Sequence, residues 1–103
     1  MEFSEVVAAA NRLGPLVHLA TITPRGEPHV VPVSGAWFER HWYAAIGVGD
    51  AKTRNIRENP SVCMHHQVSE ESGWDSLLVW GRGEILTSFM GMDSTVRTNR
   101  SPW

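Results

Sequence analysis

Apolar residues recur along this chain in short runs, and their spacing predicts one amphipathic helix followed by several strands. Residues 4–13 carry apolar side chains at helical spacing, and Gly14-Pro15 ends the pattern. The next run, Leu16–Ile22, is apolar and rich in β-branched residues, which is typical of a well-buried strand. Residues 23–28 have turn composition, so residues 29–34 are expected to form the second strand of a hairpin.

Further strands are predicted in the rest of the chain. Residues 37–38 and 42–46 form two of them, joined by a short turn, and residues 61–68 and 74–86 form two more. Glycines within the last strand indicate strong bending. Residues 87–103 have few periodic apolar positions and predict no regular element. Short antiparallel strands at this spacing favour a small barrel over a parallel sheet.

Pro32 lies inside the predicted strand over residues 29–34. A central strand needs every backbone N–H for its two neighbours, and proline has none. Pro32 therefore marks an edge, a bulge or a gap that faces a ligand.

Residues 47–60 form a glycine-punctuated loop that leads into a short basic helix. Asp50 is predicted to cap the helix by accepting a first-turn amide, and Asn59-Pro60 ends it. Lys52 stands in the first turn, and two arginines follow. Unpaired amides and the positive end of the helix dipole suit a phosphate group there. The alternative is an ordinary solvated helix on the surface.

Composition narrows the function classes. With 103 residues, 42% of them hydrophobic, the chain is expected to form a single globular domain over residues 1–103. A formal charge of -2 argues against nucleic-acid binding. The sequence contains no candidate membrane span or signal peptide, and Cys63 has no disulfide partner, so a cytoplasmic protein without membrane association is expected.

Other chemistry-bearing side chains form no recognisable motif. His65 and His66 are neighbours in a strand, so they face opposite sides and cannot chelate one metal ion together. Cys63 is expected to be a small buried residue. No serine stands in a nucleophile-elbow context, and no catalytic side chain is assigned.

Three blocks of sequence, taken together, resemble the pyridoxamine 5'-phosphate oxidase-like, FMN-binding split-barrel proteins. They are residues 19–33, 51–60 and 73–84. Within that superfamily the chain is most similar to the actinobacterial group that uses the deazaflavin coenzyme F420. The resemblance covers residues 1–86, and residues 87–103 are atypical. The part of the barrel after residue 86 is therefore expected to be missing or altered, and Asp50 stands where relatives often have a small or basic residue.

The resemblance implies a mainly β fold: a Greek-key split barrel with an N-terminal helix and a short helix over residues 51–58. It also implies a homodimer with cofactors in grooves at the interface. By position, Lys52 and the amide of Ala51 match the phosphate-holding group, and Ala45 and Ile46 match the strand end beside the ribityl chain. Two strand segments match those that face the cofactor: Val31, Pro32 and Val33, and Trp74, Asp75, Ser76 and Leu77.

The implied function is an F420-dependent oxidoreductase that transfers a hydride between the reduced coenzyme and a small organic substrate. One alternative is an FMN-dependent oxidase or reductase of the pyridoxamine 5'-phosphate oxidase type. A second alternative is a non-catalytic cofactor-binding protein or an inactive truncated homologue. In each case the cofactor carries the chemistry and the protein supplies orientation and charge complementarity.

Overall fold

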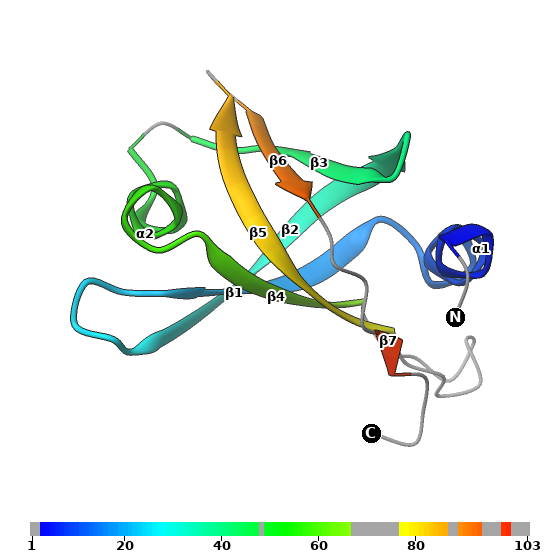
Figure 1. Cartoon of the computed structure of the whole chain (residues 1–103), viewed down its shortest axis with the longest axis horizontal. Helices are drawn as coiled ribbons and strands as arrows, with labels where there is room; N and C mark the ends of the chain where they lie inside the picture. The colour runs from blue at the N-terminus through cyan, green and yellow to red at the C-terminus, as the bar shows by residue number, and fades with distance from the viewer. Residues whose placement is uncertain (1–2, 48, 67–76, 87–88, 94–97, 100–103) are drawn as a thin grey trace.

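The computed structural model describes residues 3–47, 49–66, 77–86, 89–93 and 98–99 (Figure 1). It contains two helices and seven strands: α1 (Phe3–Leu13), β1 (Leu16–Ile22), β2 (Pro28–Phe38), β3 (His41–Ala45), α2 (Ala51–Glu58), β4 (Ser61–His66), β5 (Leu78–Leu86), β6 (Phe89–Asp93) and β7 (Thr98–Asn99). The expected mainly β architecture with two helices is confirmed. No helix among the described residues is long and apolar enough to cross a membrane.

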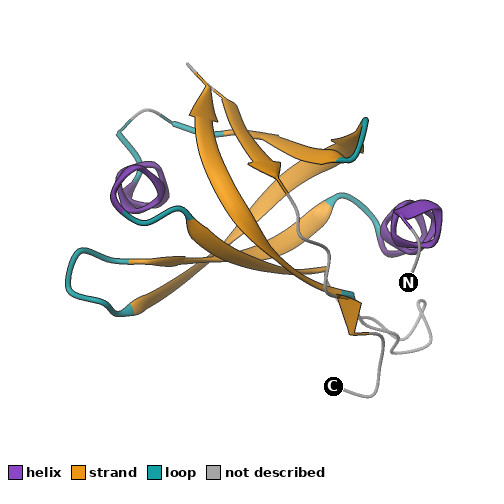
Figure 2. Cartoon of the chain, in the orientation of Figure 1, coloured by secondary structure: helices purple, strands orange, loops and turns teal. Residues whose placement is uncertain are grey.

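Six of the strands form a closed ring. Neighbouring strands follow the order β4-β1-β2-β3-β6-β5, and an additional pairing between β4 and β5 closes the ring. All of these pairings are antiparallel. Strand β7 also runs antiparallel to β5 and pairs with its first two residues, Leu78 and Val79. Figure 2 shows the strands crossing at steep angles, with α1 and α2 at opposite ends of the long axis.

The two longest strands change partners along their length. Strand β2 pairs with β1 up to Ser34 and with β3 from Gly35 onward. Strand β5 pairs with β4 up to Arg82, which also starts the pairing with β6. The glycines of β5 flank this corner, in agreement with the bending expected from the sequence. Strands β2 and β5 therefore each pair with β1 or β4 in their first part and with β3 or β6 in their last part. In this way they connect the β1–β4 pair to the β3–β6 pair.

Strand β2 continues through the position where the sequence predicts a break. Residues 37–38 were expected to form a separate strand, but they are the end of β2. The reason is the side chain of Trp42 on the paired strand. A Cβ atom at Gly35 would lie 2.3 Å from Cζ2 of Trp42, so only glycine lets the indole lie against this part of β2. The glycine here marks close packing instead of a turn.

Strands β6 and β7 are the other difference from the sequence expectation, since both lie within residues 87–103. No regular element was expected after Leu86, yet Phe89–Asp93 pairs with β3 on one side and with β5 on the other. Its sequence, Phe-Met-Gly-Met-Asp, lacks β-branched residues and strict alternation, so local preference does not predict a strand. Two unpaired strand edges, brought close by the rest of the fold, supply the hydrogen bonds that define it.

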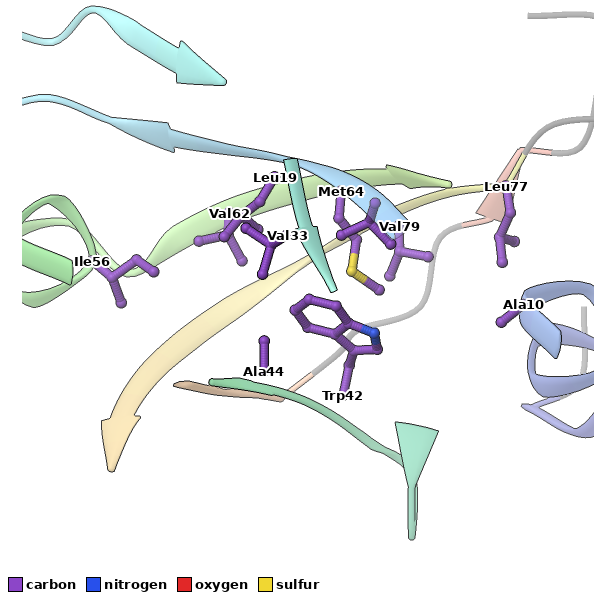
Figure 3. Packing of buried hydrophobic residues seen from close by; sticks show 11 residues of the cluster. Ala10, Leu19, Val33, Trp42, Ala44, Ile56, Val62, Met64, Leu77 and Val79 are labelled. Atoms are coloured by element: carbon purple, nitrogen blue, oxygen red, sulfur yellow. The ribbon is translucent and has the colours of Figure 1, made fainter. Parts of the chain in front are cut away.

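The hydrophobic core fills the ring. Its buried members come from five strands, from Leu77 just before β5 and from α2, with Ala10 of α1 at one side (Figure 3). Trp42 is the largest of them, and its side chain is completely inaccessible to solvent. Burying a side chain of this size contributes a large share of the stability of so small a domain.

Candidate functional site

The loop between β3 and α2 positions the start of the helix. Strand β3 ends at Ala45, and the backbone N–H of Asp50 donates to the carbonyl of Gly47 at 3.1 Å. The hydroxyl of Thr53, inside the helix, donates to the same carbonyl at 2.7 Å. The loop and the first turn of α2 are therefore joined by bonds from both the main chain and a side chain. This arrangement brings together the predicted site residues Ala45, Ile46, Ala51 and Lys52.

Asp50 occupies the N-cap position of α2, as expected, but its side chain does not cap the helix. One carboxylate oxygen, Oδ2, instead accepts the backbone N–H of Gly47 at 2.9 Å and the ammonium of Lys52 at 2.7 Å. A Cβ atom at residue 47 would lie 2.7 Å from the other carboxylate oxygen, so glycine permits this approach. The hydrogen bond from Lys52, then that from the Gly47 amide, and then the charge of Lys52 lower the pKa of Asp50.

These contacts gather two hydrogen-bond donors at the positive end of α2. Two donors, one a main-chain amide and one a cation, converge on a single anionic oxygen, and that oxygen belongs to the protein. The carboxylate of Asp50 accepts a hydrogen bond from both donors. The side chain of Lys52 is 17% exposed and that of Asp50 is 44% exposed, so the acid lies on the solvent side of the pair.

The opposite face of α2 is fixed to the barrel. Asn55 is buried, and its Nδ2 donates to the hydroxyl of Thr21 on β1 at 3.0 Å. Ile56 is buried beside Gly83 of β5, where an added Cβ would lie 3.0 Å from the isoleucine Cγ2. Sequence reasoning missed Asn55 and Thr21 because both are polar. The spacing of Thr53 and Ile56 on one helix face was the available signal.

The remaining predicted site residues lie in three environments. Pro32 and Ala45 are exposed, and Val31 and Ile46 are half-buried. Val33 and Leu77 are buried members of the core, so a ligand outside the barrel could meet only their backbone. Trp74, Asp75 and Ser76 lie outside the described residues.

The edge expected at Pro32 is present. Pro32 pairs with His18 on β1, and the pairing of β2 with β3 begins three residues later, at Gly35. The flank of β2 that faces away from β1 therefore carries no described strand at Pro32. A residue without an N–H fits this position at no loss of sheet hydrogen bonding.

The outer face of the sheet made by β2, β1, β4 and β5 is largely apolar. Strand register places its outward side chains in two rows: Pro32, His18, His65 and Leu78 in one, and Val30, Ala20, Cys63 and Trp80 in the next. Val30 is 58% exposed, although valine is usually buried. We refer to these eight residues as the outer apolar face.

Titratable groups on strand β4 are shifted by burial. Burial raises the pKa of the Cys63 thiol, which fits a small apolar role for this residue. The pKa of His65 is lowered first by burial and then by the charge of His18 across the strand pair. His65 and His66 face opposite sides of β4, as expected, with His66 inside. The described residues include no group of three or more side chains placed to hold a metal ion.

Comparisons with known proteins agree with this architecture. The sequence matches the family described as pyridoxamine 5'-phosphate oxidase over residues 3–100. No curated protein matches the chain. Among solved structures, an FAD-binding protein from Mesorhizobium loti is 22% identical, with a TM-score of 0.79 over 97% of this chain and 93% of that one.

Two further structures are similar. An F420 reductase is 24% identical, with a TM-score of 0.66 over 87% of this chain and 92% of that one. HupZ from Group A Streptococcus is 17% identical, with a TM-score of 0.72 over 96% of this chain and 90% of that one. At these identities the likeness establishes the split-barrel fold.

Proposed function

Because this chain belongs to the pyridoxamine 5'-phosphate oxidase family, we propose that it is an oxidoreductase that uses coenzyme F420. In this proposal a homodimer in the cytoplasm holds the coenzyme in a groove between its two subunits. A hydride then passes between the reduced coenzyme and a small organic substrate.

The observation that carries the proposal is the convergence of the Gly47 amide and the Lys52 ammonium on one oxygen of Asp50. The two donors could bind a phosphate oxygen, and the carboxylate of Asp50 competes with the phosphate for them. A terminal phosphate monoester, as in FMN, carries close to two negative charges at neutral pH. The phosphodiester of F420 carries one. A single first-turn cation beside a carboxylate favours the singly charged group.

The residues that would hold the coenzyme are those gathered around this site. Lys52 and the uncapped amides of the first turn, including that of Ala51, would hold the phosphate. Ala45 and Ile46 would contact the adjoining part of the molecule, and Pro32 would lie along the ring at the open flank of β2. When bound, F420 supplies hydride transfer, so the protein needs to bind, orient and exclude water.

The proposed dimer accounts for the outer apolar face. Its outward rows combine Val30 and Trp80 with half-buried histidine, alanine and cysteine side chains. No described residue at these eight positions carries a formal charge at neutral pH, which suits burial against a second copy. The open flank of β2 at Pro32 borders this face, so a groove there would be shared by two subunits.

A titration of F420 and of FMN against the same preparation tests the proposal. We expect quenching of tryptophan fluorescence by F420 and weak or no quenching by FMN. A Lys52→Ala variant should bind F420 roughly 10- to 150-fold more weakly, which is about 1.5–3 kcal/mol, the scale of a hydrogen bond to a charged group. Arg54→Ala is the matched control, because Arg54 is an exposed cation two positions along the same helix.

The outcomes separate the alternatives. Tighter binding of FMN than of F420 would show that the coenzyme is a flavin and not a deazaflavin. Equal affinities for the two helix variants would remove Lys52 from the site. Coenzyme binding without oxidation of reduced F420 across a substrate panel would support a cofactor-binding protein without turnover. A monomer in sedimentation experiments with coenzyme present would contradict the shared groove.

A further inference from the structure

A cavity lies under α1, at the end of the barrel away from α2. It has a volume of about 190 Å³ and is partly open to solvent. Its walls come from the end of α1 and the turn that follows, from β2 and β3, and from the last residue of β4. The lining residues on which the argument rests are Ala10, Pro15, Gly35, Ala36, Trp42 and His66. None of them belongs to the proposed coenzyme site.

Two buried nitrogen atoms of these lining residues lack a partner. Nε1 of Trp42 and Nε2 of His66 have no hydrogen bond among the described residues. Trp42 is 0% exposed and His66 is 1% exposed, so both side chains are buried although the cavity itself is partly open. Leaving such a buried group unpaired is unfavourable, because it has lost its hydration without gaining a partner. In Figure 3 the indole nitrogen of Trp42 is on the side of the ring toward Ala10, which is the side of the cavity.

The two nitrogens have opposite hydrogen-bonding characters. Nε1 of an indole can only donate. Nδ1 of His66 lies 3.2 Å from the carbonyl oxygen of Gly14, and a carbonyl can only accept, so Nδ1 carries the proton. Burial lowers the pKa of His66 and keeps the ring neutral near pH 7. Nε2 is then an acceptor.

We propose that this cavity binds a small, uncharged aromatic molecule that carries a hydroxyl group, of the phenol class. The hydroxyl hydrogen donates to Nε2 of His66, and the hydroxyl oxygen accepts from Nε1 of Trp42. The ring fills the apolar remainder between α1 and β2. Because neither polar group is charged, a charged ligand would lose its hydration there without a partner of opposite sign.

The size of the cavity agrees with a ligand of one ring. An apolar protein cavity of about 150 Å³ accommodates benzene, and drug-sized ligands need about 300 Å³ or more. A cavity of about 190 Å³ therefore fits a phenol and excludes a flavin or a deazaflavin. The ligand site is separate from the coenzyme site, so each can be tested without the other.

Phenol itself is the probe, added to the full-length protein and followed by NMR. We expect saturable shifts of the Trp42 indole N–H resonance and of the His66 ring resonances, with an affinity in the roughly millimolar range. Toluene has the same shape without the hydroxyl and should bind at least about fivefold more weakly, the equivalent of one hydrogen bond. Equal affinities, or no saturable shift with phenol, would overturn the proposal and leave water as the occupant.

Two substitutions locate the binding. Ala36→Leu places bulk at the cavity mouth from an exposed strand position, so it should fold normally and abolish the shifts. Ala8→Leu is the matched control, since Ala8 is an exposed residue of α1 that does not line the cavity. Phenol binding that survives Ala36→Leu would place the ligand elsewhere and refute the proposed site. Lys52→Ala should leave phenol binding unchanged.

Discussion

The two ends of the barrel are built on different principles. At the α2 end, polar contacts determine the structure: Asp50 joins Lys52 and Gly47, and Asn55 bonds to Thr21. At the α1 end, packing determines it: the buried Trp42 lies against Gly35 and borders a cavity. Figure 1 shows the helices that mark these ends far apart along the molecule.

This difference separates stability from ligand affinity. The Asp50–Lys52 pair is partly exposed, and such pairs contribute little to folding. The same pair lies where an anion would bind, so its changes should be seen mainly in affinity. The core at the α1 end is inaccessible, and its changes should be seen mainly in the free energy of unfolding. The following predictions test that division.

The largest effect is expected from Trp42→Ala. Truncating a fully buried indole should lower the free energy of unfolding by about 3–5 kcal/mol, measured by urea denaturation. Phe38→Ala is the control, because this aromatic side chain is 64% exposed and should change stability by no more than about 0.5 kcal/mol. Similar losses for the two variants would mean that packing at the α1 end is not what holds the ring.

Asn55→Ala should have an intermediate effect. It removes the buried bond to the hydroxyl of Thr21 and should cost about 1–3 kcal/mol in unfolding free energy. A double-mutant cycle with Thr21→Val isolates the pair. If the two single losses simply add, the bond does not fix α2 to β1, and the polar account of this end fails.

Asp50→Asn should improve F420 binding by roughly two- to fivefold. Asparagine keeps the size and the N-cap preference of this position while it frees Lys52 from its internal anion. Isothermal titration of both proteins with F420 measures the change. Weaker binding by the variant would show that the carboxylate assists the ligand instead of competing with it.

The smallest effect is the pH dependence from β4. Burial lowers the pKa of both His65 and His66 below the ordinary value of 6.5, so the unfolded chain binds protons more readily than the folded one. Stability should therefore fall as the pH drops through 6.5 and level off below the lowered values. Urea denaturation across this range measures the slope. His66→Gln keeps a donor for Gly14 and should reduce the slope, whereas an unchanged slope would contradict the assignment.

Sequence alone predicted much of the barrel, because strong local signals coincide with its elements. The strand over Leu16–Ile22 has the bounds expected from its β-branched run, and α2 ends before Asn59-Pro60 as expected. Two features escaped. The separate strand expected over residues 37–38 was wrong, because the need for glycine at residue 35 comes from the Trp42 indole on another strand. Strand β6 has no local signal because its partners lie far away in the sequence.

The candidate site was predictable in its location and not in its bonding. A glycine loop, an N-cap acid and a first-turn lysine indicated the start of α2 correctly. The side chain of Asp50 could either cap the helix or bond to Lys52. Which of the two occurs depends on distances that are set only when the loop before α2 is folded. The cavity under α1 was invisible for the same reason. It combines residues from one helix and three strands that no spacing rule connects.

The position of β6 late in the sequence determines when the ring of strands can close during synthesis. A nascent chain emerges from the ribosome with its N-terminus first, and β3 is made long before Phe89–Asp93. Until then, β3 and the second half of β5 each lack the neighbour that separates them from other strands. Ring closure therefore follows synthesis of this late segment, and a ribosome stalled before it would hold two open strand edges that invite pairing with other chains.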